Sequence, residues 1–567
     1  MKKFEDYEYI RPEFEVLEDK FKGITDRFIN STSCEEQINC FYEYNSLIED
    51  FGTMYGLVEI RNSVNTEDEF YRAESDYFDE TYPKIQGLMV DFQRAVVDSK
   101  FRNELEEEVG SLLLAKYEMN LNTFSDEVLE LLIEEEKLIS TYDRLVASAK
   151  IDFNGEVYTL SRLMPFMKSK DRSIRKGANE AYFGFFSDNI EEFDNIYDRL
   201  VKLRDEIAKK LGFANFVELA YARMSRTDYD AKDVKVYRQE IEKNVVPIVN
   251  DLIKRQSDRI GVSKLKYYDE AIEFVSGNAE PKGDPEWIME KGRELYKRLG
   301  EVPNEFFNFM EDRNLFDLLS KDNKMAGGYC TYIPNYRSPF IFANFNGTSD
   351  DVDVLTHEAG HALQFYLSRD IKQFELMVPG YEGAEIHSTS MEYLAYPHID
   401  LFFEDETEKY KFAHISDLLK SMAYIASIDE FQHFVYENPN VSPEERRFKY
   451  REIERKYLPN RDYEDNEFLN NGGKRMRQGH VFQVPFYYID YALAEVCALQ
   501  FFVNSLKDYD ETMKSYLELC KIGGTKSFLG LVEYAGLKNP FKEGTLKNIV
   551  NEVNSYLNNI DDKSLDK

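Results

Sequence analysis

The feature that most constrains this chain is the stretch VDVLTHEAGHALQFY (352–366), in which two histidines and a glutamate interrupt an apolar run. On an α-helix, residues four positions apart lie on one face, about one turn apart. His357 and His361 can then aim their rings at one point, and Glu358 can reach the same neighbourhood. The pattern predicts a mostly buried helix that carries two zinc ligands and a general base.

Chance is the alternative explanation for this five-residue pattern, because only three of its positions are fixed. The chain has only seven histidines in 567 residues. Two of them in one such match are improbable by chance, so the metal hypothesis is favoured over a structural helical protein.

A catalytic zinc site needs a third protein ligand, and the stretch GAEIHSTSMEYLAY (383–396) offers one. On a helix, Glu385 and Glu392 share one face, so Glu385 can complete the coordination. Glu392 either holds a ligand imidazole by its other nitrogen or forms a salt bridge on the helix surface. His387 lies about 200° round the helix from Glu385. We therefore expect His387 to be structural or to face the substrate, not to bind the metal.

Most of the chain has the periodicity of long helices, with apolar residues at steps of three and four in residues 125–149. One hairpin interrupts it, where Asn154 and Gly155 separate two alternating runs. We predict a mainly α fold with a soft boundary near residue 195. Residues 1–195 form a helical region with the hairpin near 150–160, and residues 196–567 form the catalytic region, the two being fused into one body.

A short strand is expected directly before the metal helix, because Phe340 to Phe345 alternate between the two faces of a strand. This strand either pairs with an extended peptide and lays its scissile bond beside the metal, or it is an ordinary buried edge strand. Both interpretations predict a small β-sheet next to the metal helix.

The segment LNNGGKRMRQGH (469–480) places three basic residues among three glycines in an acidic protein. The glycines give backbone freedom, so the segment is a candidate lid whose movement carries His480 in and out of the site. Its charges either attract a peptide carboxylate or belong to a solvated surface loop.

Composition excludes several classes of partner. The formal net charge is −35, from 106 acidic residues against 71 Lys and Arg, which argues against nucleic acid and anionic membranes. No apolar run reaches the roughly 18 residues of a membrane span, and the first residues do not form a signal peptide. The five cysteines lack metal-site spacing. We expect a cytoplasmic protein with reduced, buried thiols.

Three motifs together resemble the thimet oligopeptidase and oligoendopeptidase F family of zinc metallopeptidases, and most closely its Pz-peptidase-like branch. They are HEAGHALQFY, AEIHSTSMEYL and GHVFQVPFYYIDYALAEV. The resemblance is strongest over residues 325–502. It is traceable upstream in the hairpin and in LGFANFVELAYARMSR (211–226).

The resemblance implies a large helical body split by a deep substrate channel, with one Zn²⁺ per chain at its floor. It implies that the metal ligands are His357, His361 and Glu385, that the base is Glu358, and that the substrate carbonyl is bound by His480, Tyr488 and Tyr491. Some relatives carry a further tyrosine where this sequence has VFQVPF.

The function expected on this basis is a zinc-dependent oligoendopeptidase that cleaves internal bonds of short unstructured peptides and acts as a monomer or weak homo-oligomer. Two alternatives stay open. One is a dipeptidyl carboxypeptidase on the same scaffold, and the other is a peptide-binding protein without catalysis.

Overall fold

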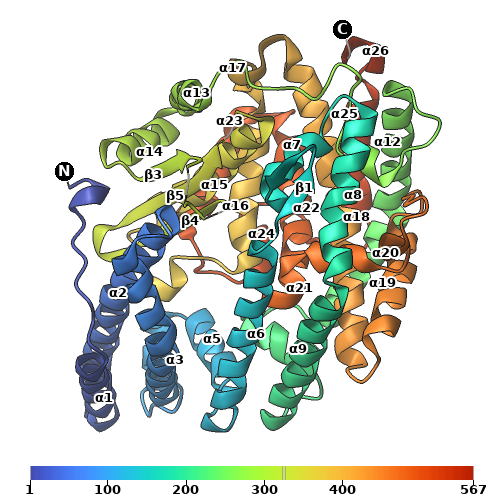
Figure 1. The fold of residues 1–567 in the computed structure, drawn as a ribbon. Helices are drawn as coiled ribbons and strands as arrows, with labels where there is room; N and C mark the ends of the chain where they lie inside the picture. The colour runs from blue at the N-terminus through green and yellow to red at the C-terminus, as the bar shows by residue number, and fades with distance from the viewer. Residues whose placement is uncertain (1, 322, 326, 346, 566–567) are drawn as a thin grey trace.

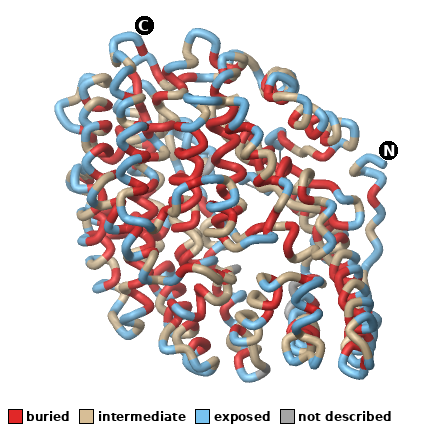
Figure 2. Tube along the Cα trace, turned by 180° about the vertical axis from the view of Figure 1, so that it is seen from behind, coloured by how far each residue is buried: buried red, intermediate tan, exposed pale blue. Residues whose placement is uncertain are grey.

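The computed structural model describes residues 2–321, 323–325, 327–345 and 347–565 (Figure 1). Within them the chain is mainly α, with one two-stranded and one three-stranded sheet, as the sequence predicts. Buried backbone runs through the middle of the body, and the exposed segments gather at its rim (Figure 2).

The first part of the chain is a row of helices that Figure 1 shows side by side. Their bounds are α1 (Phe14–Asn30), α2 (Cys34–Val64), α3 (Glu69–Val97), α4 (Arg102–Val109), α5 (Ser111–Leu121) and α6 (Leu129–Ala147). Helix α2 begins at a capping box, in which the Ser33 hydroxyl accepts from the Glu36 amide and the Glu36 carboxylate accepts from the Ser33 amide. Helices α1 to α5 share an apolar core of their own.

The predicted hairpin is confirmed. Strand β1 (Ile151–Phe153) pairs antiparallel with β2 (Glu156–Tyr158). Asn154 and Gly155 at the turn have φ of 52° and 83°, and two consecutive positive φ angles are what a type I′ turn requires.

The remaining helices form the larger part of the body. Those before the second sheet are α7 (Leu160–Met167), α8 (Arg172–Asp188), α9 (Ile190–Lys210), α10 (Phe216–Arg223), α11 (Ala231–Glu240), α12 (Val246–Arg259), α13 (Pro285–Arg298) and α14 (Glu301–Asp312). Those after it are α15 (Ser349–Ser368), α16 (Tyr381–Leu394), α17 (Asp400–Phe403), α18 (Thr407–Glu437), α19 (Pro443–Tyr457), α20 (Glu467–Asn470), α21 (Gly479–Gln483), α22 (Ile489–Ser505), α23 (Tyr509–Ile522), α24 (Phe528–Tyr534), α25 (Thr545–Asn558) and α26 (Asp562–Leu565).

Residue 195, where the sequence places a soft boundary, lies inside the continuous helix α9. One large core cluster includes Tyr7 from the segment before α1 and Leu57 from α2, together with Leu493 from α22. The two regions therefore share apolar packing, and their division at residue 195 stays a prediction.

The second sheet has the order β3-β5-β4, formed by β3 (Phe316–Leu319), β4 (Tyr329–Ile333) and β5 (Ser338–Phe345). Strand β5 pairs parallel with β3 and antiparallel with β4. The small sheet next to the metal helix is confirmed. The expectation of an edge strand at Phe340–Phe345 is wrong, because β5 is the central strand and both of its edges already carry ladder hydrogen bonds.

The basic segment, residues 469–480, is only in part the solvated loop that its composition suggests: Arg477 is exposed, but the other two basic residues are not. It forms the end of α20, the 3-10 helix η9 (Gly473–Arg477) and the start of α21. Lys474 and Arg475 are buried. Their side chains donate to Glu270 at 3.1 Å and to Asp194 at 3.3 Å.

Two glycines of the basic segment allow close packing, and Gly472 also has a φ of 85°, which favours glycine. A Cβ at Gly472 would lie 2.0 Å from the carbonyl oxygen of Arg447, and one at Gly473 would lie 2.3 Å from the ring of Phe468. Because the segment is packed and paired in this way, its sequence features do not support a lid.

Within the described residues, no helix is both long and apolar enough to cross a membrane.

Candidate metal centre

The helix that carries the two candidate histidines is α15. Its N-cap residue is Thr348, and the Asp351 carboxylate accepts a hydrogen bond of 2.6 Å from the amide of Gly347. This hydrogen bond ties the residue before the N-cap to the first turn, and a carboxylate there suits the positive end of the helix dipole. The helix then runs beside β4 and β5 and holds His357 and His361 one turn apart.

Glu385 reaches these histidines from α16, which packs closely against α15. A Cβ at Gly360 would lie 2.7 Å from both the carbonyl oxygen of His387 and the Cα of Ser388. The glycine inside the HEAGH motif therefore lets the two helix backbones approach each other. This approach brings a carboxylate from one helix to two imidazoles on the other.

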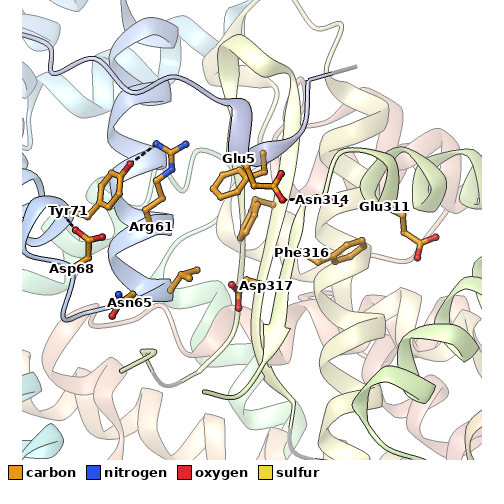
Figure 3. Close-up of a pocket in the computed structure, with 12 residues that line it drawn as sticks. Glu5, Arg61, Asn65, Asp68, Tyr71, Glu311, Asn314, Phe316 and Asp317 are labelled. Atoms are coloured by element: carbon orange, nitrogen blue, oxygen red, sulfur yellow. Dashed lines mark hydrogen bonds between the residues drawn. The ribbon is translucent and has the colours of Figure 1, made fainter. Parts of the chain in front are cut away.

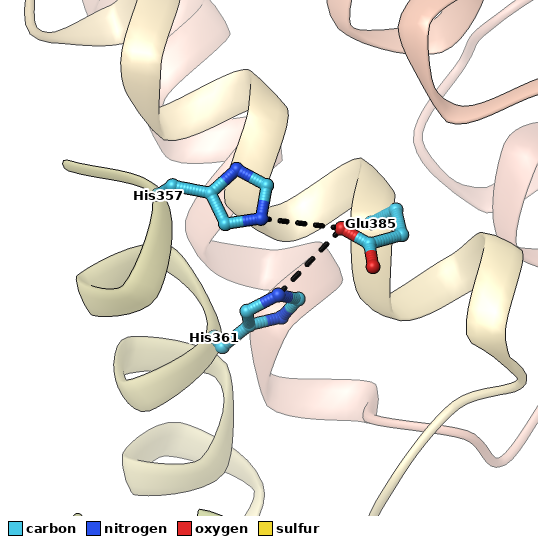
Figure 4. A group of neighbouring side chains, drawn as sticks. All are labelled: His357, His361 and Glu385. Atoms are coloured by element: carbon cyan, nitrogen blue, oxygen red, sulfur yellow. Dashed lines mark ion pairs between the residues drawn. The ribbon is translucent and has the colours of Figure 1, made fainter. Parts of the chain in front are cut away.

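The three side chains converge on one point (Figure 4). Nε2 of His357 and Nε2 of His361 lie 3.3 Å and 3.6 Å from Oε2 of Glu385. Two ligands of a tetrahedral zinc are about 3.4 Å apart when each is about 2.1 Å from the ion. The spacing and the chemistry of the donors, two imidazoles and a carboxylate, fit a zinc ion.

Other side chains hold two of the candidate ligands in place. Nδ1 of His357 lies 2.6 Å from Oε1 of Glu392, and the second oxygen of Glu392 lies 2.7 Å from Nε2 of His414. A carboxylate on the second nitrogen fixes the tautomer and the ring orientation of a ligand histidine. The Ser388 hydroxyl donates to Oε2 of Glu385 at 3.0 Å.

The carboxylates of Glu385 and Glu392 have lowered pKa values. Burial raises the pKa of Glu385, but the hydrogen bond from His357 and the neighbouring imidazoles lower it to about 2. Burial likewise works against the charge of Glu392, yet its hydrogen bonds to His357 and His414 lower its pKa to about 2. The carboxylates of Glu385 and Glu392 are therefore ionised at neutral pH although they are buried.

The candidate base has a different environment. Burial raises the pKa of Glu358 to about 7, although the charge of His357 acts in the opposite direction. A carboxylate whose pKa lies near neutral pH is suited to accept a proton and to return it.

Four aromatic residues from the segment around α21 and α22 form a cluster that contacts Glu385 through Tyr487. The ring of His480 is 4.7 Å from that of Tyr488 and 5.8 Å from that of Tyr491. Tyr487 donates a hydrogen bond of 2.8 Å from its phenol to Oε1 of Glu385. Burial lowers the pKa of His480 to about 4, so its ring is neutral at neutral pH.

Comparisons with known proteins identify the family of the chain. The family model "Peptidase family M3" matches residues 165–551, and "Peptidase M3 N-terminal domain" matches residues 4–124. The chain belongs to peptidase family M3. The resemblance to oligoendopeptidase F and Pz peptidase noted in the sequence is thereby confirmed.

Relatives of this M3 peptidase are similar over most of their length. The "Oligoendopeptidase F homolog" of Borreliella burgdorferi is 24% identical, covering 74% of this chain and 72% of the relative. "Oligopeptidase PepF" of Bacillus subtilis is 20% identical, covering 87% of this chain and 76% of the relative.

Two solved structures are much more similar. "PZ PEPTIDASE A with inhibitor 2" has a TM-score of 0.96 and 50% identity, covering 99% of this chain and all of the other. A "putative oligoendopeptidase F from Bacillus anthracis str. Ames" has a TM-score of 0.92 and 51% identity, with both chains fully covered.

The structure adds two residues to the candidate site that the sequence motifs do not point to. Tyr487 contacts Glu385, and its position four residues before Tyr491 is a spacing that can place two side chains on one helical face. His414 lies in α18 with no motif around it, so no local signal marks it. His387 is structural: it is fully buried, and its Nδ1 lies 2.7 Å from the carbonyl oxygen of Gly383.

A separate hollow lies between the amino-terminal segment, α2 and β3 (Figure 3). Its carboxylates already have partners: the Asn314 amide donates to Glu5 at 2.7 Å, and Lys324 pairs with Asp317 at 2.6 Å. The described residues that line it include none of the candidate site residues.

Proposed function

We propose that this chain is a zinc-dependent oligoendopeptidase that hydrolyses internal peptide bonds of short unstructured peptides. The observation that carries the proposal is the convergence of His357, His361 and Glu385 with ligand-like spacing. Glu358, the candidate base, follows His357 directly in the same helix. Membership of a peptidase family supports the reaction type.

In this proposal, His357, His361 and Glu385 hold one zinc ion and leave a fourth position open. When bound, zinc supplies a Lewis acid that polarises the scissile carbonyl and makes a neighbouring water acidic near neutral pH. Glu392 keeps the ring of His357 in the binding orientation through its hydrogen bond to Nδ1.

The role of Glu358 is that of general base and then general acid. Its carboxylate takes the proton of the attacking water and afterwards delivers it to the amine of the leaving peptide. A pKa near 7 suits both steps, because the group is then neither a very weak base nor a very weak acid at neutral pH.

His480, Tyr488 and Tyr491 are assigned to the carbonyl oxygen of the substrate. The phenols are neutral donors, since burial raises their pKa values further above neutral pH. Donors that are already in place where negative charge develops lower the barrier without reorganisation.

Strand β4 is the strand that could align the substrate. Among the described strands, β4 pairs with β5 alone. The charge of Glu358 contributes to raising the pKa of the β4 residue Cys330, which supports a course of β4 beside the base. An extended peptide added to this edge would lie along the metal helix, at the floor of the channel that the resemblance implies.

We further propose that the enzyme acts in the cytoplasm as a monomer or weak homo-oligomer, with residues 1–195 and 196–567 as its two fused regions. All five cysteines are free thiols, three of them buried, which suits a reducing compartment.

The experiment that tests the proposal uses two versions of one decapeptide, with free and with blocked termini. Internal cleavage of both, lost on chelation and restored by Zn²⁺, is the expected result. Release of dipeptides from the free carboxyl terminus alone would instead indicate a dipeptidyl carboxypeptidase. No cleavage by the zinc-loaded chain would leave only a peptide-binding role.

A further inference from the structure

The turn that carries the site tyrosines contains a strained residue. Phe486 has a φ of 69° and its side chain is fully buried. A bulky residue with positive φ is a true backbone outlier, unlike glycine or asparagine in the same conformation. Such strain persists only when the surrounding structure over-determines it, and it gathers at functional sites.

Two side chains fix the backbone of Phe486 from both sides. Its amide donates a hydrogen bond of 3.0 Å to Oε1 of Gln432 in α18. Its carbonyl accepts one of 2.7 Å from Nη2 of Arg226. Both peptide groups of the strained residue are therefore held by side chains that lie far away in the sequence.

Arg226 also spans the turn. Its Nη2 donates to Oδ1 of Asp490 in the first turn of α22 at 2.6 Å, and both side chains are fully buried. Its guanidinium lies 4.2 Å from the ring centre of Tyr221 and 5.3 Å from that of Tyr229. These rings restrict the rotation of the guanidinium. Because Arg226 bonds both Phe486 and Asp490, one arginine fixes both ends of the turn.

The residues between these two anchors are Tyr487, Tyr488 and Ile489, and Tyr491 follows directly. Tyr487 contacts Glu385, and Tyr491 contacts Tyr487 at 2.9 Å between hydroxyls. The turn held by Arg226 therefore sets the direction of the phenols of Tyr487 and Tyr491, which are connected to the candidate metal centre.

We propose that Arg226 is a positioning residue for peptide hydrolysis, which holds the strained turn at Phe486 so that the site phenols face the substrate carbonyl. Arg226 acts through the turn, because its contacts are to the carbonyl of Phe486, to Asp490 and to two aromatic rings. This inference rests on the proposed function for its catalytic consequence, but not for the geometry of the turn.

The test compares Arg226→Lys with Arg446→Lys. Arg446 is a matched control, since it is also fully buried and donates to one carboxylate, Asp198 at 2.9 Å, and to one backbone carbonyl, Pro439 at 2.7 Å. A lysine keeps the charge in both cases but cannot reproduce the planar fork of the guanidinium. Each variant therefore loses guanidinium hydrogen bonds to one carboxylate and one backbone carbonyl. In Arg226→Lys these bonds hold the turn, and in Arg446→Lys they lie away from it.

Two readouts are measured with saturating Zn²⁺: kcat and KM on an unstructured decapeptide, and hydrogen exchange of the peptide that covers residues 484–491. For Arg226→Lys we expect a loss of kcat on the order of 10-fold to 10²-fold, little change in KM, and faster exchange in 484–491. For Arg446→Lys we expect wild-type kcat, wild-type KM and wild-type exchange in 484–491.

Equal kcat and equal exchange in the two variants would overturn the inference. Should Arg226→Lys not fold, Asp490→Asn removes the other half of the ion pair, and the same readouts decide. Wild-type protein that cleaves no peptide would defeat the proposed function, whereas exchange in 484–491 would still decide whether Arg226 holds the turn.

Discussion

The phenol of Tyr487 donates a hydrogen bond of 2.8 Å to Oε1 of Glu385. This contact joins the turn before α22 to the carboxylate that faces His357 and His361. The third candidate ligand and the candidate substrate donors are therefore connected by hydrogen bonds. We expect a substitution in one of them to change the position of the other.

Replacing Tyr487 by Phe removes a donor from Glu385 and leaves the ring in place. Because outer partners orient metal ligands, we expect zinc affinity to fall about 10-fold to 10²-fold. Tyr488→Phe removes a phenol whose nearest aromatic partner is the ring of His480, so it should lower kcat by about 10²-fold at unchanged zinc affinity. Competition with a chromophoric chelator measures the affinities. Equal zinc affinities for the two variants would contradict this division of roles.

Replacing Glu392 by Gln removes the negative charge that Nδ1 of His357 contacts at 2.6 Å. We expect zinc affinity to fall about 10-fold to 10²-fold, and the visible spectrum of the Co²⁺-loaded protein to change with the orientation of the ring. Glu495→Gln is the control, because Glu495 is also buried and accepts from Tyr393 at 2.6 Å. A Glu392→Gln variant with the affinity of Glu495→Gln would show that Glu392 does not orient His357.

Replacing Gly360 by Ala places a methyl group against the backbone of α16, 2.7 Å from atoms of His387 and Ser388. Overpacking of this kind costs roughly 1–3 kcal/mol, and here it also moves Glu385 away from the histidines. We expect lower stability and loss of zinc binding. At Gly184 in α8 a Cβ meets nothing within 4 Å, so Gly184→Ala should stabilise by up to about 1 kcal/mol. Thermal unfolding and zinc titration of both variants check this; unchanged zinc binding in Gly360→Ala would refute the close-approach argument.

Replacing Glu270 by Gln removes the carboxylate that accepts from the buried Lys474 and from the guanidinium of Arg461, which keeps Glu454 as a second partner at 3.1 Å. Burial raises the pKa of Glu270, but these two cations lower it to about 2 from an ordinary value of 4.5. A lowered folded-state pKa means that the stabilisation is complete above about pH 4.5 and is lost as the pH falls toward 2. We expect Glu270→Gln to lose about 1–3 kcal/mol at pH 7.

Urea unfolding at pH 7 and pH 4 measures how this difference depends on pH. The gap between wild type and Glu270→Gln should be smaller at pH 4. Glu18→Gln serves as the control, because its pair with Lys22 is exposed and such surface pairs contribute little. A gap that does not shrink with pH would show that the charge of Glu270 is not what stabilises the basic segment.

Those parts of the fold and site that depend on short-range patterns could be predicted from the sequence. Helical periodicity predicts α6. The pair Asn154 and Gly155 predicts the hairpin, because both residue types tolerate the positive φ angles that the turn has. The spacing of His357 and His361 fixes their common face. Glu385 is predicted from ligand chemistry instead, because a catalytic zinc needs a third protein ligand, and the structure places it beside the two histidines.

What could not be predicted depends on contacts between distant segments. Nothing local tells a central strand from an edge strand, so β5 was misplaced. The basic segment looks solvated by composition, yet the partner of Lys474 is Glu270, 204 residues away. Arg226 meets the turn at Phe486 across 260 residues, and no short motif marks such a pairing.

The role of Glu358 is decided by mass spectrometry of an unstructured decapeptide after incubation with wild type and with Glu358→Gln, each with its zinc content determined. We expect internal cleavage by wild type, one zinc per chain in both proteins, and a loss of cleavage in the variant on the order of 10³-fold or more, because the base is removed while the ligands stay. A zinc-loaded Glu358→Gln variant that cleaves at near the wild-type rate would contradict this role.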